Sequence, residues 1–229
     1  MVDTENHKTP WKFVALMAVL MSSVALSIDA MMPALNQIRE DLHVKNANDV
    51  QLVISMVFLG MAFGLMFFGP FSDSFGRKKA MYLGTGIFLI GCLASIFSTT
   101  FEIMIFGRLL QGLGAASCRV ATFAMIRDKF EGNAMAKIMS LIMIIFILVP
   151  ALAPAIGQGI LYLSTWRAIF VLMFVVGVLS ILWLGFGQEE TLVMEKRLPF
   201  SVKTIINGIC ETVRNKTARG YTLASSLIF

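Results

Sequence analysis

Long apolar runs divide the chain into six segments separated by short polar stretches. Each run has about 20 residues, enough for an α-helix to cross a hydrocarbon core about 30 Å thick. The runs are Phe13–Leu35, Val50–Phe71, Met81–Ser98, Ile103–Met125, Ile138–Leu163 and Ala168–Phe186. A further run begins near Tyr221 and reaches Phe229. Because a helix cannot end in mid-bilayer with unsatisfied carbonyls, we expect the sequence to be a fragment.

This pattern predicts an all-α polytopic membrane protein rather than a soluble globular domain. Hydrophobic residues make up 57% of the sequence and charged residues 14%. Ordinary globular domains have about 45–50% and about 25%, respectively. Such a chain cannot cover its surface with polar side chains, so we expect part of that surface to face lipid.

Lysine and arginine residues gather in alternate connections between the apolar runs. Basic clusters precede the first run and follow the second, fourth and sixth, whereas the other connections carry only Arg39, Lys45 and Arg167. The positive-inside rule therefore predicts a cytoplasmic N-terminus. The predicted parts are a cytoplasmic N-terminus (1–12), a six-helix transmembrane bundle (13–186), a cytoplasmic linker (187–219) and the start of a seventh helix (220–229). Within the linker, Ser201–Val213 is either an amphipathic interfacial helix or a solvated segment.

The net charge of +5 does not predict a nucleic-acid-binding protein. The basic residues lie in short clusters beside apolar runs, and they form no basic face with aromatic platforms. Cys92, Cys118 and Cys210 are isolated, and no His/Cys spacing predicts a metal site. The sequence also lacks a GxxxxGK[ST] phosphate loop and a recognisable catalytic constellation. We therefore expect no cofactor and no enzymatic activity.

Three ionisable residues lie within the apolar runs: Asp29, Arg108 and Arg119. Charges inside a membrane are costly, so their presence indicates function. Asp29 and Arg108 each lie about six residues from the outer end of a helix, roughly 9 Å deep. They can therefore pair, or each can reach separately toward the interface. Arg119 follows Arg108 by three helical turns, with Gln111 on the same stripe. This stripe faces a cavity or a closely packed neighbour, unless Arg119 forms an ion pair near the cytoplasmic end.

The segment Gly69–Lys79 connects the second and third runs. Its glycines, Gly69 and Gly76, permit a tight turn. Asp73 lies between them and can cap the next helix through backbone N–H groups. The basic residues that hold this segment on the inner side are Arg77, Lys78 and Lys79.

The fifth run contains Pro150 and Pro154, which free backbone carbonyls and predict a bent helix. Gly157 and Gly159 follow and allow close contact with a neighbouring helix. A bent helix rich in small residues suits the moving halves of a transporter, although both residue types are common in membrane helices generally.

These segments resemble the major facilitator superfamily, and within it the Bcr/CflA type of multidrug:proton antiporter. The matching segments are Ser27–Leu35 (S-x-D-x-Y-L-P-A-L), Gly69–Lys79 (G-x-x-x-D-R/K-x-G-R-R/K), Arg108–Ala116 (R-x-x-Q-G-x-G) and Pro150–Gly159 (the antiporter motif). Trp166-Arg167 and Glu190-Thr191-Leu192 also fit the family. Three positions depart from these patterns: Met31 replaces a tyrosine, Ser74 a basic residue and Gln158 a glycine.

The resemblance implies a twelve-helix protein in which two six-helix halves enclose a substrate cavity and alternate between inward-open and outward-open states. The partner of this segment would be the C-terminal six-helix half. Proton or substrate coupling would fall to Asp29, Arg108, Gln111 and Arg119. A cytoplasmic gate would include Gly69, Asp73, Gly76, Arg77, Lys78 and Arg127. The membrane would be the bacterial inner membrane.

We therefore expect proton-driven efflux of small amphipathic drugs, with Asp29 binding a proton or a cationic substrate. An importer or exporter of a metabolite, from the same superfamily, is the main alternative. A membrane-embedded enzyme, a passive channel and a non-transporting half-protein are further alternatives.

Overall fold

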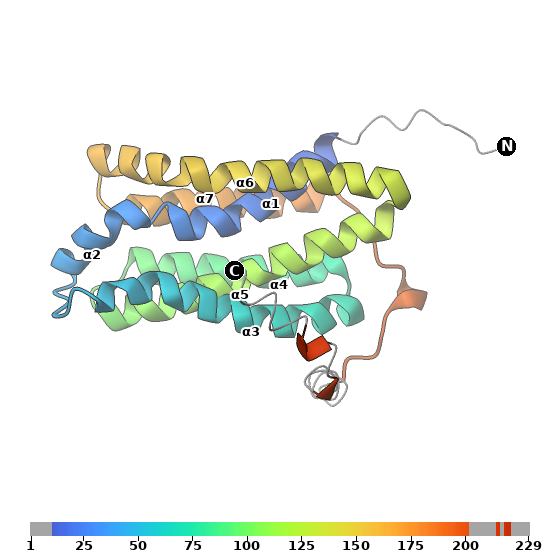
Figure 1. The fold of residues 1–229 in the computed structure, drawn as a ribbon, viewed down its shortest axis with the longest axis horizontal. Coiled ribbons are helices and arrows are strands. Elements are labelled where there is room, and N and C mark those ends of the chain that lie inside the picture. Colours follow the sequence, from blue (N-terminus) through green and yellow to red (C-terminus); the bar gives the residue numbers. More distant parts are fainter. Residues whose placement is uncertain (1–10, 202–213, 216–217, 221–229) are drawn as a thin grey trace. The chain divides into compact units, whose positions relative to one another are not determined.

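The structure, a computed structural model, describes residues 11–201, 214–215 and 218–220 (Figure 1). The chain divides into two compact units, Met1–Arg197 and Leu198–Phe229. The first unit contains all of the helices and networks discussed here. The predicted amphipathic helix at Ser201–Val213 and the predicted seventh helix at 220–229 lie almost entirely outside the described residues, as do residues 1–10.

Seven α-helices make up the described part of the first unit. They are α1 (Trp11–Asp29), α2 (Leu35–Asp41), α3 (Leu52–Phe75), α4 (Arg77–Ile96), α5 (Phe101–Lys129), α6 (Gly132–Leu163) and α7 (Arg167–Gly187). Three short 3-10 helices accompany them: η1 (Met32–Ala34), η2 (Asp49–Gln51) and η3 (Met194–Lys196). With α1, η1 and α2 joined as one segment, six helical segments are long and apolar enough to cross a membrane. The predicted all-α fold with six spans is confirmed.

The first span is broken near its C-terminal end, where the sequence predicted one helix over Phe13–Leu35. α1 ends at Asp29, and the chain passes through a turn and η1 before α2 begins at Leu35. Pro33 explains the break because it has no N–H to donate to the carbonyl of Asp29, four residues earlier. Asp29 is therefore the last residue of a helix that ends within the membrane-spanning segment.

The helices form two groups in Figure 1, one of α3, α4 and α5 and the other of α1, α6 and α7. Glycines bring the backbones of the first group together. A Cβ at Gly112 of α5 would lie 2.7 Å from the carbonyl carbon of Val57 in α3. A Cβ at Gly91 of α4 would lie 2.6 Å from the carbonyl oxygen of Gly107 in α5. Both distances are too short for a side chain, so α5 packs directly on two neighbouring backbones.

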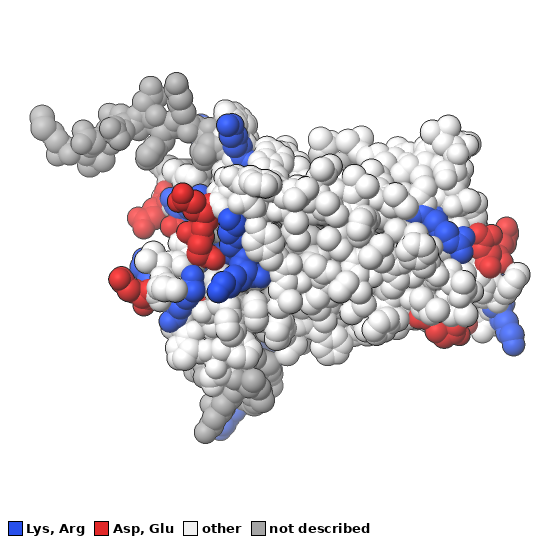
Figure 2. Space-filling view, turned by 180° about the vertical axis from the view of Figure 1, so that it is seen from behind, with Lys and Arg blue, Asp and Glu red and all other residues white. Residues whose placement is uncertain are grey.

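The charged side chains gather at the two ends of the bundle, and a broad band between them is free of charge in the view of Figure 2. The helix most exposed along this band is α6, of whose 32 residues only Ile138, Ile142, Ala153 and Gly157 are buried. A surface of this kind fits the hydrocarbon core of a bilayer or an apolar partner.

Candidate functional site

Arg108 of α5 is fully buried and joins four helices through its guanidinium group. Its Nε donates to the carbonyl of Val53 in α3 at 2.7 Å. Its Nη2 donates to the carbonyl of Ser27 in α1 at 2.6 Å. Its Nη1 donates to Oε1 of Gln111, one turn along α5, at 2.8 Å. The ring of Phe170 in α7 lies 5.7 Å from the guanidinium carbon. The predicted inward-facing arginine is therefore a hub of the bundle.

Gln111 extends this network to a further helix. Its Nε2 lies 3.0 Å from Sγ of Cys92 in α4, and both side chains are fully buried. Because Oε1 of Gln111 accepts from Arg108, its amide group is fixed at both ends. Gly112 and Ala115, one and four residues after Gln111 on α5, are also buried. The stripe was predicted to face either a cavity or a closely packed neighbour. Around Gln111 it faces a closely packed neighbour.

The ion pair that we considered between Asp29 and Arg108 is not formed. Among the described residues, the hydrogen-bond partners of Arg108 are two backbone carbonyls and one amide, with no carboxylate. Asp29 lies two residues beyond Ser27 and is half-buried. The alternative in which Arg108 reaches the interface is wrong as well, since its side chain is completely enclosed. Two backbone carbonyl oxygens and the amide oxygen of Gln111 accept from the guanidinium in place of a carboxylate.

Arg119 does not share the environment of Arg108, although the two lie almost in line on α5. It is exposed in the described chain, and no ion-pair partner for it is found among the described residues. The predicted ion pair is therefore absent from this part of the chain. The face of α5 that is covered at Arg108 is open three turns further on.

The basic end of the bundle carries a second network, centred on Arg77, the first residue of α4. Arg77 pairs with Asp73 one turn earlier in α3. Its Nε donates to Asp128 of α5 at 2.9 Å, and its Nη1 also donates to Ser72 at 3.1 Å. Thr191 donates its hydroxyl to the same carboxylate oxygen of Asp128 at 3.1 Å. Arg77 therefore connects the ends of α3 and α5 with the start of α4.

The predicted loop at Gly69–Lys79 is reduced to one residue. α3 continues through Gly69 and Asp73 to Phe75, and α4 begins at Arg77. Only Gly76 lies between them, with a φ of +105° that residues with a side chain rarely adopt. The sequence prediction was wrong for Gly69, around which no atom lies within 4 Å of an added Cβ. A helix can continue past Pro70 because neighbouring helices compensate for the lost backbone bond.

Glu190, rather than Asp73, caps α4. Its Oε1 accepts from the backbone N–H of Arg77 at 3.0 Å, and its Oε2 accepts from that of Lys78 at 3.1 Å. The Oε1 atom also accepts from the N–H groups of Thr191 and Leu192 at 3.0 and 3.1 Å. The predicted capping role of Asp73 is wrong because its carboxylate binds Arg77 instead. A carboxylate at a helix N-terminus is also favoured by the helix dipole.

The remaining gate residues of the prediction lie beside this network. Lys78 donates to the carbonyl groups of Gly185 and Gln188, at the end of α7, at 3.1 and 2.6 Å. Arg127 is exposed and lines a hollow of about 240 Å³ together with Asp73 and Asp128. Arg127 and Arg77 therefore border the same hollow.

The proline-containing helix α6 runs through Pro150 and Pro154 without interruption. Gly157 is buried against the break in the first span. A Cβ added there would meet the carbonyl of Ala30 and would lie 3.2 Å from the ring of Pro33. Gly159 has no atom within 4 Å of an added Cβ. Of the two predicted contact glycines, only Gly157 therefore makes a close approach.

The opposite end of the bundle has a cluster that sequence reasoning noted only as a family pattern. The fully buried Trp166 donates its indole N–H to Asp41 at 2.8 Å, and its backbone N–H donates to Gln37 at 3.1 Å. The guanidinium of Arg167 lies 4.2 Å from the Trp166 ring and donates to the carbonyl of Ser98 at 3.1 Å. These contacts tie α2 and the end of α4 to the start of α7.

Sequence reasoning assigned no role in a site to three residues that complete these networks: Cys92, Asp128 and Glu190. Asp128 could have been found, because a carboxylate among the basic residues at a helix end requires a partner. Cys92 gave no signal, since a lone cysteine in an apolar run looks like a small hydrophobic residue. Among the described residues, no group of three or more His, Cys, Asp or Glu side chains is placed to hold a metal ion.

Residues 15–219 match the family model described as Major Facilitator Superfamily. The chain is 32% identical over 230 residues to the uncharacterized MFS-type transporter YdgK of Bacillus subtilis, covering 100% of this chain and 57% of that protein. It is 33% identical over 229 residues to the bicyclomycin resistance protein homolog of Haemophilus influenzae, covering 98% and 56%. The chain therefore spans about half the length of these curated relatives.

A similar fold occurs in the solved structure of the proton:xylose symporter XylE bound to 6-bromo-6-deoxy-D-glucose. The TM-score is 0.72 at 13% sequence identity, covering 92% of this chain and 51% of that one. An identity this low shows the fold alone.

Proposed function

Because this chain belongs to the major facilitator superfamily, we propose that the whole protein is a secondary active transporter that exports small amphipathic drugs in exchange for protons. The chain is an integral, multi-pass membrane protein of a transporter family rather than an enzyme. The Haemophilus influenzae relative is named a bicyclomycin resistance protein homolog, which supports drug-like substrates. The bacterial inner membrane, with a cytoplasmic N-terminus, is the proposed location.

The observation that carries this proposal is the buried Arg108, bound to the last turn of a helix that ends at Asp29. Its Nη2 holds the carbonyl of Ser27, two residues before that carboxyl group. A charge enclosed in a membrane protein is costly and is retained where it serves transport. Helix ends within a membrane segment supply backbone groups that bind ions or protons. Asp29 is the proposed proton-binding or cation-binding group, and Arg108 and Gln111 are its proposed electrostatic partners.

The proposed coupling does not require a permanent ion pair. Arg108 is satisfied by carbonyl groups in this structure, so Asp29 is free to exchange a proton without leaving the guanidinium unpaired. A small movement at the break after α1 would bring a charged Asp29 closer to Arg108. Arg119, exposed on the same helix, is proposed to face the substrate cavity formed with a C-terminal half.

The basic end of the bundle is the proposed cytoplasmic gate. Asp73, Arg77 and Asp128 join α3, α4 and α5, and Arg127 borders the same hollow. Ion pairs of this kind can open and re-form as helices move. The Arg77–Asp73 pair is the easier one to break because the Asp73 side chain is 46% exposed. Arg77 and Asp128 are largely buried, so their pair costs more to separate. Pro150, Pro154 and Gly157 of α6 are proposed to let this helix move against the broken first span.

The test is proton-gradient-driven efflux by the full-length protein in inverted membrane vesicles, measured with a fluorescent lipophilic cation. Asp29→Asn should abolish coupled efflux because the amide cannot exchange a proton at neutral pH. Glu40→Gln is the matched control, since Glu40 is an exposed carboxylate beyond the same break. Efflux by Asp29→Asn at the wild-type rate would remove Asp29 from the mechanism. Transport that is independent of the proton gradient in the unmodified protein would remove proton coupling altogether.

A further inference from the structure

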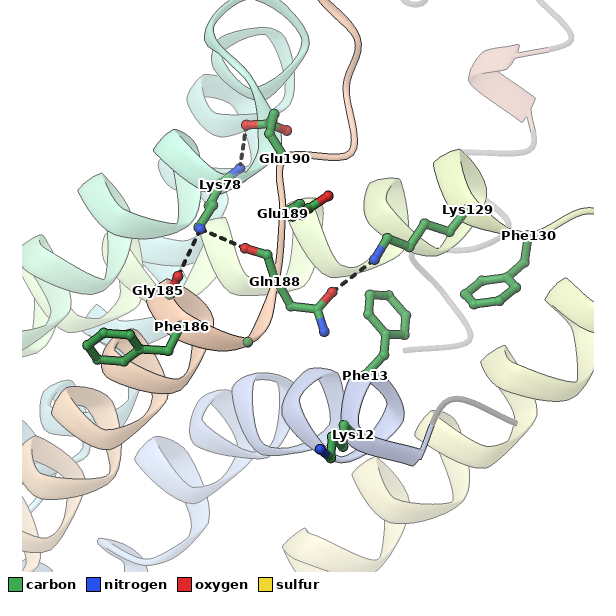
Figure 3. Close-up of a pocket in the computed structure, with 11 residues that line it drawn as sticks. Lys12, Phe13, Lys78, Lys129, Phe130, Gly185, Phe186, Gln188, Glu189 and Glu190 are labelled. Atoms are coloured by element: carbon green, nitrogen blue, oxygen red, sulfur yellow. Dashed lines mark hydrogen bonds between the residues drawn. The ribbon is translucent and has the colours of Figure 1, made fainter. Parts of the chain in front are cut away.

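A hollow of about 660 Å³ lies at the basic end of the bundle, beside the network of Arg77 (Figure 3). It is bordered by the first turns of α1 and α4, the ends of α5 and α7, and the segment after α7. Three of these elements each supply one lysine: Lys12 from α1, Lys78 from α4 and Lys129 from α5. The volume lies within the range of about 300–1,000 Å³ that is usual for small-molecule sites.

The hydrogen-bond acceptors of these lysines, among the described residues, are neutral oxygens rather than carboxylates. Lys78 donates to two carbonyl groups, and Lys129 donates to the side-chain oxygen of Gln188 at 2.9 Å. Among the described residues, Lys12 has no hydrogen-bond or ion-pair partner and is exposed. All of these acceptors are neutral, so the lysine charges remain available to an anion.

The two glutamates that border the hollow offset only part of this charge. Glu190 accepts from four backbone N–H groups, two of which lie in the first turn of α4. Glu189 is exposed and its charge acts on Lys129, but its side chain lies away from Lys12 in Figure 3. The border of the hollow therefore carries three lysines against two glutamates, one of which is already bound by backbone N–H groups.

Aromatic rings place Lys129 at the edge of the hollow. Its Nζ lies 4.8 Å from the centre of the Phe13 ring, and Phe13 packs against Phe130 at 5.7 Å. A cation over an aromatic face is held in position without being neutralised. The lysine is thus already oriented before a ligand arrives, which lowers the entropic cost of binding.

The hollow continues into an apolar surface of α7. Phe186, on its border, is 93% exposed. Trp183, Leu182 and Leu179 precede Phe186 by three, four and seven residues and are also exposed. This spacing puts the four side chains on one face of the helix. A soluble anion would not contact such a face, whereas the acyl chains of a lipid would pack against it.

We propose that this hollow binds the phosphate headgroup of an anionic phospholipid whose acyl chains lie along the exposed face of α7. Basic pockets between membrane helices attract anionic headgroups. Tryptophan at this depth fits the boundary between headgroups and acyl chains. The lipid comes from the leaflet at the basic end of the bundle, and its binding fixes the ends of α1, α5 and α7 relative to one another.

The test measures how much phosphatidylglycerol stays bound to the full-length protein. Wild-type and variant proteins are purified from membranes of equal phosphatidylglycerol and phosphatidylcholine content, and the retained lipids are quantified by mass spectrometry. The test variant is Lys12→Gln with Lys129→Gln. The control is Lys79→Gln with Lys137→Gln, which makes the same change in charge at the same end but outside the hollow. Circular dichroism and size-exclusion chromatography verify folding in each case.

We expect each lysine lost from the hollow to lower phosphatidylglycerol retention about fivefold, since a basic residue near the surface contributes about 1 kcal/mol of lipid attraction. The control variant should retain wild-type levels. Equal losses in both double variants would indicate diffuse attraction and overturn the proposal. Stabilisation of the detergent-solubilised protein by inorganic phosphate alone, to the same extent as by phosphatidylglycerol, would overturn the lipid assignment. If the double variant fails to fold, Lys12→Gln alone provides the same comparison.

Discussion

Glu190→Gln is the substitution whose effect follows most directly from the structure. The two carboxylate oxygens of Glu190 accept from four backbone N–H groups, two of which belong to Arg77 and Lys78 in the first turn of α4. Glutamine keeps the size of the side chain but has only one acceptor oxygen. With that oxygen at the Oε1 position, its amide group would face the N–H of Lys78, donor against donor.

The expected cost at the start of α4 is about 1–2 kcal/mol. A helix cap contributes about 1 kcal/mol, and a negative charge at a helix N-terminus adds about 0.3–1 kcal/mol. At 1.4 kcal/mol for each factor of ten, the first turn of α4 should open about tenfold more often.

Hydrogen exchange of the full-length protein, followed by mass spectrometry, measures this opening in peptides that cover Arg77–Met81. Exchange there should be about tenfold faster in Glu190→Gln than in the wild type. Glu189→Gln is the matched control, because Glu189 is exposed and no hydrogen bond to its side chain is found among the described residues. Equal exchange in the two variants would show that Glu190 does not cap α4, and the reasoning would then fail.

Two further substitutions test the packing of the bundle. Gly112→Ala should destabilise the protein by about 1–3 kcal/mol through overpacking, because its Cβ would lie 2.7 Å from the carbonyl carbon of Val57. Gly86→Ala, with open space around it, should be neutral. A detergent unfolding titration measures the stability of both variants. Trp166→Phe should cost about 1.5–3 kcal/mol in the same titration, since it removes an indole N–H bonded to the carboxylate of Asp41. Trp183→Phe, on a partly exposed ring, should leave the midpoint unchanged.

The spans could be predicted from the sequence because hydrophobic length is a local property. A run of about 20 apolar residues leaves the backbone no alternative to a helix in a bilayer. The break after Asp29 was also encoded locally, by Pro33, but the apolar run over Phe13–Leu35 concealed it. The end of α3 also differs from the prediction. Gly69 and Pro70 are residues typical of a turn, but the neighbouring helices keep α3 intact as far as Phe75.

The partners of the charged residues could not be predicted, since they depend on distances between helices. Arg108 was correctly placed inside the bundle, yet its acceptors are backbone carbonyls of Ser27 and Val53, which no side-chain pattern reveals. The cap of α4 comes from Glu190, 113 positions after Arg77. A nearby carboxylate, Asp73, was the natural choice from local spacing.

The short connection between α5 and α6 has a geometric consequence for how the bundle can open, because these helices belong to different groups. With only Phe130 and Glu131 between Lys129 and Gly132, the facing ends of α5 and α6 can separate by no more than about 11 Å. At the other end, residues 42–48 connect α2 to η2, and a stretch of that length can reach about 25 Å. The connections between the two groups are therefore longer at one end of the bundle than at the other. The α3–α4–α5 group can separate from α1, α6 and α7 most widely at the end that carries Trp166.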